Sequence, residues 1–187
     1  MRAARGGKSV KRLFLVMALL IAIAACGATF VRVRGDLTQQ RDSITATWTQ
    51  VTEAMEHRAN VSRRMAERFQ TLGDSPALIL QDLDAARTAL AQGGGPEHKI
   101  SANDRLSVGL SKLLLEAERR PHVSADEEFH QMEEELRSAE DRIAVARLNY
   151  NDALAHYNTR IQSFPHNVVA HLAGFSRDDA YFKTIPF

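Results

Sequence analysis

The strongest constraint on the fold is a seven-residue repeat in the last third of the chain. Large apolar side chains stand at these intervals: Phe129, Leu136, Ile143, Tyr150, Tyr157 and Phe164. Smaller residues form a second row between them: Met132, Ala139, Ala146 and Ala153. A repeat sustained over about five heptads predicts a long helix that packs against its neighbours at a shallow angle with a left-handed twist. The alanines allow a neighbouring backbone to approach closely.

This helix has recognisable ends. Ser124, followed three residues later by Glu127, has the spacing of a capping box, in which two side chains bond to free backbone N–H groups at the helix start. Pro165 cannot continue a helix, because it lacks an N–H and its ring clashes with the preceding turn. The sequence therefore predicts a helix over residues 124–164.

A second long helix is predicted over residues 37–72, with Asp36 as its cap. Its apolar residues also recur in sevens, in two rows: Leu37, Ile44, Val51, Met65 and Leu72, then Trp48, Met55 and Phe69. Arg58 and Ser62 interrupt these rows. Gly73 suits the helix end, since glycine readily adopts the left-handed conformation found there.

Two shorter amphipathic segments, 76–92 and 101–121, lie between the long helices, and Gly93–Pro96 connects them. We expect the two segments to form one interrupted helical arm of the bundle, because successive glycines and a proline break a helix. No segment has a convincing period of two. The predicted fold class is all-α: an elongated antiparallel bundle of three to four helices.

One apolar stretch precedes this bundle. Residues 13–31 contain no charge, and a helix of 19 residues reaches about 28 Å, close to the roughly 30 Å of a bilayer's hydrocarbon layer. Five basic residues precede it within residues 1–12 and only two follow, which favours a cytoplasmic N-terminus. We expect a single-pass transmembrane anchor, with the bundle domain, residues 36–187, on the far side.

The same residues allow a second interpretation. A basic segment, an apolar core and small residues also describe a secretory signal, and Ile23–Gly27 resembles a bacterial lipobox. The signal would then be cut before Cys26 and the thiol lipidated. The apolar run continues past Cys26 to Val31, which favours a retained helix in which Cys26 is an inert small residue. Both interpretations place the body at a bilayer surface.

Charge is segregated along the chain. Residues 1–34 hold seven of the 24 basic residues and none of the 23 acidic ones, so residues 35–187 carry 17 basic and 23 acidic side chains, a formal net charge of −6. A mildly acidic body argues against nucleic-acid binding, which needs a basic surface. A single cysteine excludes an intramolecular disulfide framework and a cysteine-based zinc site.

Little in the chain predicts catalysis. The seven histidines form no H-E-x-x-H pair, and His166 and His171 are five residues apart, which does not align two ligands on a helix face. No G-x-S-x-G elbow is present, and Cys26 lies inside the apolar stretch, away from soluble substrates. We expect no catalytic residue, no metal and no cofactor.

Two Tyr-Asn pairs, Tyr150-Asn151 and Tyr157-Asn158, are seven residues apart and therefore share one face of the last helix. Glu140 and Arg147, also seven apart, lie nearby. In the structural interpretation, the tyrosines fill a heptad row while their hydroxyls and the asparagine amides bond across helices and fix the register. In the functional one, this face is a groove for a peptide or a glycan.

These residues resemble the pattern of the bacterial LemA family. The matching positions include Trp48, Glu140, Arg147, Tyr150, Asn151, Tyr157, Asn158, Phe164 and Pro165. The arrangement YN-x5-YN-x5-FP is the most specific part, and the resemblance covers most of residues 36–182. It implies a helical bundle on a membrane anchor and defines no molecular activity.

We therefore expect a non-enzymatic interaction or scaffold protein of the bacterial envelope, held by one span in the inner membrane with its body in the periplasm. The expected partners are the lipid bilayer, an envelope or membrane protein of unknown identity, and a second copy in a homo-oligomer. The alternatives are a peptide- or glycan-binding module on the Tyr150/Tyr157 face and a lipoprotein acylated at Cys26. The tail after His166 is expected to close the core, or else to present an aromatic surface to a partner or the bilayer interface.

Overall fold

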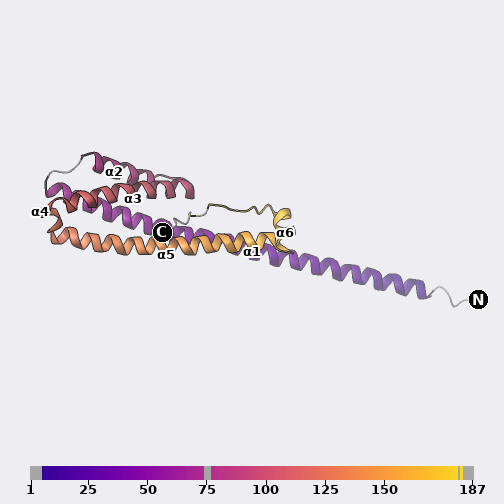
Figure 1. Ribbon diagram of the computed structural model, residues 1–187. Helices are drawn as coiled ribbons and strands as arrows, with labels where there is room; N and C mark the ends of the chain where they lie inside the picture. The colour runs from indigo at the N-terminus through magenta and orange to yellow at the C-terminus, as the bar shows by residue number, and fades with distance from the viewer. Residues whose placement is uncertain (1–5, 74–76, 181, 183–187) are drawn as a thin grey trace, which may run out of the picture. The chain divides into compact units, whose positions relative to one another are not determined.

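A computed structural model describes residues 6–73, 77–180 and 182, and every regular element in them is an α-helix (Figure 1). The helices are α1 (Gly6–Thr71), α2 (Ala77–Ala91), α3 (Pro96–Glu118), α4 (Pro121–Ser124), α5 (Glu127–Gln162) and α6 (His166–Ala173). The predicted all-α class is confirmed.

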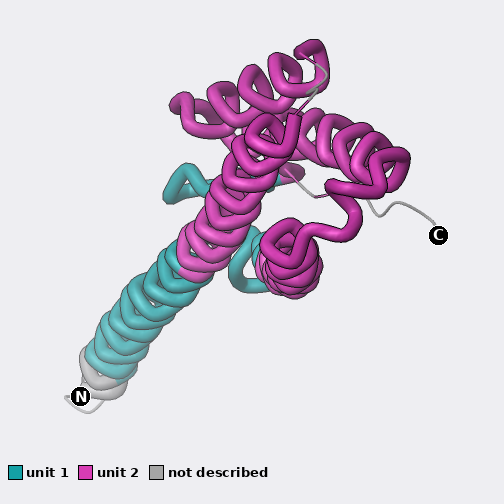
Figure 2. Tube along the Cα trace, turned by 90° about the vertical axis from the view of Figure 1, so that its left-hand side faces the viewer, with its two compact units in different colours: residues 1–42, 156–178 teal, residues 43–155, 179–187 magenta. Residues whose placement is uncertain are grey.

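The chain divides into two compact units, coloured separately in Figure 2. Unit 1 comprises Met1–Asp42 and His156–Asp178, and unit 2 comprises Ser43–Ala155 and Asp179–Phe187. Both α1 and α5 continue from one unit into the other along the chain. Each of these two helices therefore contributes residues to two cores.

α1 is one uninterrupted helix of 66 residues. The prediction that a new helix starts at Asp36 is wrong, because Gly35 and Asp36 both lie inside α1. A glycine in a helix interior costs only about 1 kcal/mol, too little to break a long helix. The N-terminal part of α1 is long and apolar enough to cross a membrane, with a mean hydropathy of 2.6 and no burial within the structure.

The heptad rows of α1 and α5 supply much of the core of unit 2. Their largest fully buried side chains in this unit are Val51, Met55, Met65, Phe69, Phe129 and Tyr150. Leu154 of α5 is also buried, whereas its neighbour Ala153, the predicted member of the second row, is only half-buried. The Phe69 and Phe129 rings lie edge to face with centroids 6.3 Å apart. Arg58 and Ser62 are buried as well. The two positions that interrupt the apolar pattern thus belong to the core.

α2 and α3 form a helical hairpin instead of the expected single broken arm. They lie side by side in Figure 1, and their apolar faces are buried through Leu83, Ala86, Leu90, Leu106, Leu110 and Leu113. Gly109 makes the close approach possible, since a Cβ at this position would lie 2.8 Å from Leu83 Cδ2. The Gly93–Pro96 stretch reverses the chain, and Pro96 opens α3, where its missing N–H has no cost.

Asp126 caps α5, in place of the predicted Ser124–Glu127 box. The Phe129 N–H donates to Asp126 Oδ1 at 2.9 Å, whereas Ser124 belongs to α4 and its hydroxyl donates to a carbonyl there. Arg68 of α1 donates two hydrogen bonds to the same carboxylate, at 3.0 and 2.6 Å. The Arg68 bond lowers the pKa of Asp126, and desolvation opposes it. One carboxylate therefore both caps α5 and ties it to α1.

Unit 1 has a smaller core. Its buried side chains are Val33, Leu37, Tyr157, Asn158, Ile161, Val169 and Ala170. The prediction that Phe164 is the last member of the heptad row is wrong. α5 ends at Gln162, and Phe164 lies in the following turn with 83% of its surface exposed. α6 ends at Ala173, and the positive φ of 74° at the following Gly174 lets the Phe175 N–H reach the Ala170 carbonyl at 2.9 Å.

Replacing Gly109 by valine is expected to lower the free energy of unfolding by about 1–3 kcal/mol, because the added carbons overpack against Leu83. Gly35→Val is the matched control, since no described atom lies within 4 Å of a Cβ there. Valine has the higher helix propensity, so this control should be neutral or slightly stabilising. Urea unfolding followed by circular dichroism measures both. Unchanged stability of Gly109→Val would contradict the tight α2–α3 contact.

Candidate functional site

Asn151 of α5 holds the backbone of the C-terminal segment in unit 2. Its Nδ2 donates to the Phe182 carbonyl oxygen at 3.1 Å, and its Oδ1 accepts from the Phe182 N–H at 3.0 Å. One amide thus satisfies both backbone groups of a residue that has no helix partner. We call this two-bond arrangement an amide clamp.

Phe182 is buried in an aromatic cluster with Trp48 of α1 and Tyr150 of α5. Its ring centroid lies 6.2 Å from that of Trp48 and 5.9 Å from that of Tyr150, and the latter two rings are 5.2 Å apart. The Arg147 guanidinium lies 4.6 Å from the Phe182 centroid, within cation–π range. The motif residues Trp48, Arg147, Tyr150 and Asn151 therefore all meet the C-terminal segment.

The second Tyr-Asn pair makes corresponding contacts in unit 1. Asn158 Nδ2 donates to the Asp178 carbonyl at 2.5 Å, and Asn158 Oδ1 accepts from the Asp178 N–H at 3.0 Å, a second amide clamp. The Tyr157 hydroxyl donates to the Ser176 carbonyl at 2.8 Å. Burial raises the pKa of Tyr157, Arg41 opposes this and Asp178 adds to it. The phenol therefore stays protonated at neutral pH and remains a donor.

These contacts differ from those expected of the motif. The amides and the Tyr157 hydroxyl bind backbone groups of the non-helical segment after α6, and not a neighbouring helix. Both tyrosines and Asn158 are buried, so the face proposed as a ligand groove is covered. Two further motif residues lie elsewhere: Pro165 directly precedes α6, and Glu140 lies near the guanidinium of Arg58.

Unit 2 contains a buried arginine, Arg58, which the heptad pattern does not predict. Arg58 of α1 donates from Nη2 to Asn103 Oδ1 at 2.7 Å and to the Asn103 carbonyl at 2.9 Å, and from Nη1 to Ser107 Oγ at 3.0 Å. Glu140 Oε1 of α5 lies 4.0 Å from Nη1. Burial lowers the pKa of Arg58 and Glu140 counteracts it. A guanidinium nevertheless stays charged at neutral pH, so this cation joins α1, α3 and α5.

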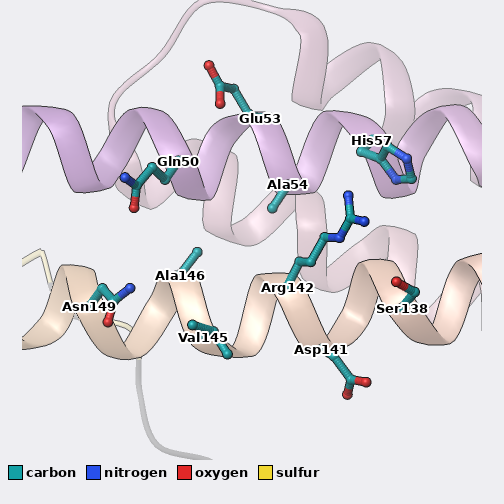
Figure 3. A pocket seen from close by; sticks show the side chains of 10 residues that line it. All are labelled: Gln50, Glu53, Ala54, His57, Ser138, Asp141, Arg142, Val145, Ala146 and Asn149. Carbon is teal, nitrogen blue, oxygen red and sulfur yellow. The ribbon is translucent and has the colours of Figure 1, made fainter.

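An open groove of about 650 Å³ runs between α1 and α5 in unit 2 (Figure 3). α1 lines it with Gln50, Glu53, Ala54 and His57, and α5 with Ser138, Asp141, Arg142, Val145, Ala146 and Asn149. Figure 3 shows the Arg142 side chain extending from α5 toward α1, between Ala54 and His57, whereas Asp141 points away from α1. The groove thus combines small side chains with charges of both signs.

Cys26 is exposed in the apolar part of α1. Within the described residues, no three His, Cys, Asp or Glu side chains lie close enough to hold one metal ion. The polar side chains that the structure does bring together, Asn151, Asn158 and Arg58, bind groups of this chain itself.

This chain matches one protein family and resembles several individual proteins of known name. The model of the LemA family matches residues 47–186, a range that holds both Tyr-Asn pairs, Arg58 and the groove. The chain is 32% identical over 93 residues to the magnetosome proteins MamQ 1 and MamQ 2 of Paramagnetospirillum magneticum, and 31% identical over 97 residues to the magnetosome protein MamQ of Magnetospirillum gryphiswaldense. These matches cover 50–52% of this chain and 34–35% of the relatives, so the chain spans about a third of the length of these curated relatives.

Asn151→Ala and Asn158→Ala are each expected to lower the free energy of unfolding by about 1–3 kcal/mol, because a backbone N–H and C=O lose their partner. Asn149→Ala is the matched control: Asn149 is exposed on the same helix, so its loss should change stability by less than about 0.5 kcal/mol. Urea unfolding of the full chain measures all three. Full stability in both clamp variants would contradict the packing role of the motif.

Arg58→Met is expected to destabilise by about 1–3 kcal/mol, because Asn103 is left buried without its partner. The double variant Arg58→Met/Asn103→Leu should recover most of this loss, since an apolar pair leaves no unpaired group. Arg63→Met serves as the control, because the exposed Arg63–Glu67 pair is worth at most about 1 kcal/mol. Urea unfolding curves of each variant measure the free energies of unfolding. A double variant as unstable as the sum of its single changes would contradict the coupling.

Proposed function

We propose that this chain, which belongs to the LemA family, is a membrane-anchored interaction or scaffold protein and not an enzyme. The observation that carries the proposal is the open groove between α1 and α5. Both motif tyrosines and Asn158 are buried inside the body, whereas most of the groove residues are accessible on two long helices. A rigid pair of helices with an accessible groove between them is suited to receiving another helix.

The chemistry of the groove indicates what kind of helix fits. Ala54 and Ala146 leave room for a backbone to approach, and Val145, 57% exposed, offers an apolar edge. Glu53 and Arg142 place opposite charges along the same groove. An amphipathic helix with small apolar residues three and four apart, flanked by charges of both signs, complements this surface. The partner is an envelope or membrane protein, or a second copy of this chain.

The N-terminal part of α1 accounts for membrane association, because its apolar side chains are exposed along the whole stretch. We favour a retained single-pass helix with a cytoplasmic N-terminus and a periplasmic body, since more positive charges precede the stretch than follow it. Cleavage before Cys26 with acylation of its thiol is the alternative. The intact mass of the membrane-extracted protein distinguishes the two, because only the second removes the first 25 residues.

A peptide- or glycan-binding face at Tyr150 and Tyr157 is the alternative function. Both tyrosines are at most 2% exposed, and the amides beside them already bind the C-terminal segment. A ligand could enter only after that segment had left. The α1–α5 groove requires no such change, so we place the interaction there.

Photo-crosslinking tests the interaction function. The full chain carrying p-benzoylphenylalanine in place of Val145 is expected to give a discrete protein adduct in its native membranes after illumination. Coexpression of a second copy with a different tag tells self-association from a distinct partner. Ala54→Arg should abolish the adduct without changing the circular dichroism spectrum, because the new side chain fills the groove.

The matched control carries the crosslinker in place of Arg137, which is exposed on α5 and does not line the groove. We expect no discrete protein adduct from this position. Equal labelling at both positions, or adducts that survive Ala54→Arg, would count against the groove as the interaction site.

A further inference from the structure

Three exposed apolar side chains lie together in sequence at and before α6. Phe164 in the preceding turn is 83% exposed, and Val168 and Leu172 of α6 are 50% and 69% exposed. Val168 and Leu172 are four residues apart and therefore share one face of the helix. The neighbouring residues Val169 and Ala170 are buried in the core of unit 1. α6 thus has two apolar faces, and only one of them is covered within the described structure.

α6 is held against α1 in unit 1 by a contact between a histidine and an aspartate side chain. His166 Nε2, at the start of α6, lies 2.9 Å from Asp36 Oδ2 of α1, and Arg160 Nε lies 3.4 Å from the same oxygen. Val33 and Leu37, on either side of Asp36, are buried. α6 is therefore held against α1 immediately after the apolar stretch, which ends at Val31. In Figure 1, α6 lies beside α1, and the N-terminal part of α1 extends beyond it.

The distance from the span to this contact is short. Asp36 follows Val31 by five residues, which corresponds to about 7.5 Å along a helix. The headgroup region adds roughly 5–8 Å to each side of the hydrocarbon layer. A helix with its side chains is about 10–12 Å wide, so side chains of an α6 docked at Asp36 reach into that region. Arg32 and Arg34 lie on the intervening turn, where they can meet lipid phosphates.

We propose that Phe164, Val168 and Leu172 form a second membrane contact, inserted into the interfacial layer of the same bilayer that α1 crosses. Amphipathic helices that lie in the plane of a membrane bury their apolar faces at this depth. The contact extends the membrane surface already made by α1 and fixes the C-terminal end of α5 at the bilayer. It holds for either orientation of α1 in the membrane, because α6 docks on the part of α1 that follows the apolar stretch.

Depth-dependent fluorescence quenching tests this contact. The full-length variant Leu172→Trp is reconstituted in phosphatidylcholine vesicles whose acyl chains carry bromine near the headgroup end. We expect the emission of the added tryptophan, after subtraction of the Trp48 signal of the unmodified chain, to shift to shorter wavelength and to lose most of its intensity. Phe164→Trp should behave in the same way.

Leu148→Trp is the matched control, because Leu148 is also an exposed leucine, 65% exposed, but lies on α5 14 residues before its end. Its emission should be insensitive to bromine. Flotation of the vesicles establishes that each variant is anchored, and circular dichroism establishes that it is folded. If the added tryptophan of an anchored, folded Leu172→Trp chain is quenched no more than that of Leu148→Trp, the proposal is overturned. If Phe164→Ser/Leu172→Ser changes the oligomeric mass while the Leu172→Trp emission stays unquenched, the face binds protein and the proposal is equally overturned.

Discussion

The buried heptad face of α5 is the constraint on which the rest of the structure depends. Residues seven apart drift by only about 20° around a helix, so one row can serve two cores in succession. Of this row, Phe129 and Ile143 are buried in unit 2, and Tyr157 is buried in unit 1. The same repeat places Asn151 and Asn158 on a common side of the helix, where each holds one residue of the C-terminal segment by two hydrogen bonds.

The spacing of apolar residues in the sequence predicts the fold class and most of the buried helix faces. The all-α class and most of the buried rows of α1 and α5 follow from this spacing and from helix-breaking residues. The start of α5 is less predictable, because Ser124, Asp126 and Glu127 are all good residues near a helix N-terminus. The structure identifies Asp126 as the cap through its bond from the Phe129 N–H, and Arg68 of α1 holds the same carboxylate in place.

Two parts of the candidate site could not be predicted from spacing, for different reasons. A pattern search counts Arg58 and Ser62 as interruptions, because the partners that make a buried guanidinium tolerable, Asn103 and Ser107, lie more than 40 residues away in another helix. The clamps bind backbone groups, which carry no sequence signature, so the partners of Asn151 and Asn158 are visible only in the structure. The hydrogen-bonding capacity that could have recognised a ligand is used to hold the chain's own tail. The accessible surfaces include the α1–α5 groove and the exposed apolar side chains at and before α6, which is why we infer an interaction role.

The central claim is that the Tyr-Asn motif of α5 is a device for packing the C-terminal segment. Hydrogen–deuterium exchange of the unmodified full chain tests it most directly, because Asp178 and Phe182 lie outside every helix and their N–H groups donate to the clamps. The account predicts that both amides exchange far more slowly than those of an unstructured chain. Exchange of both at the rate of unstructured peptide, with α5 itself fully protected, would contradict it.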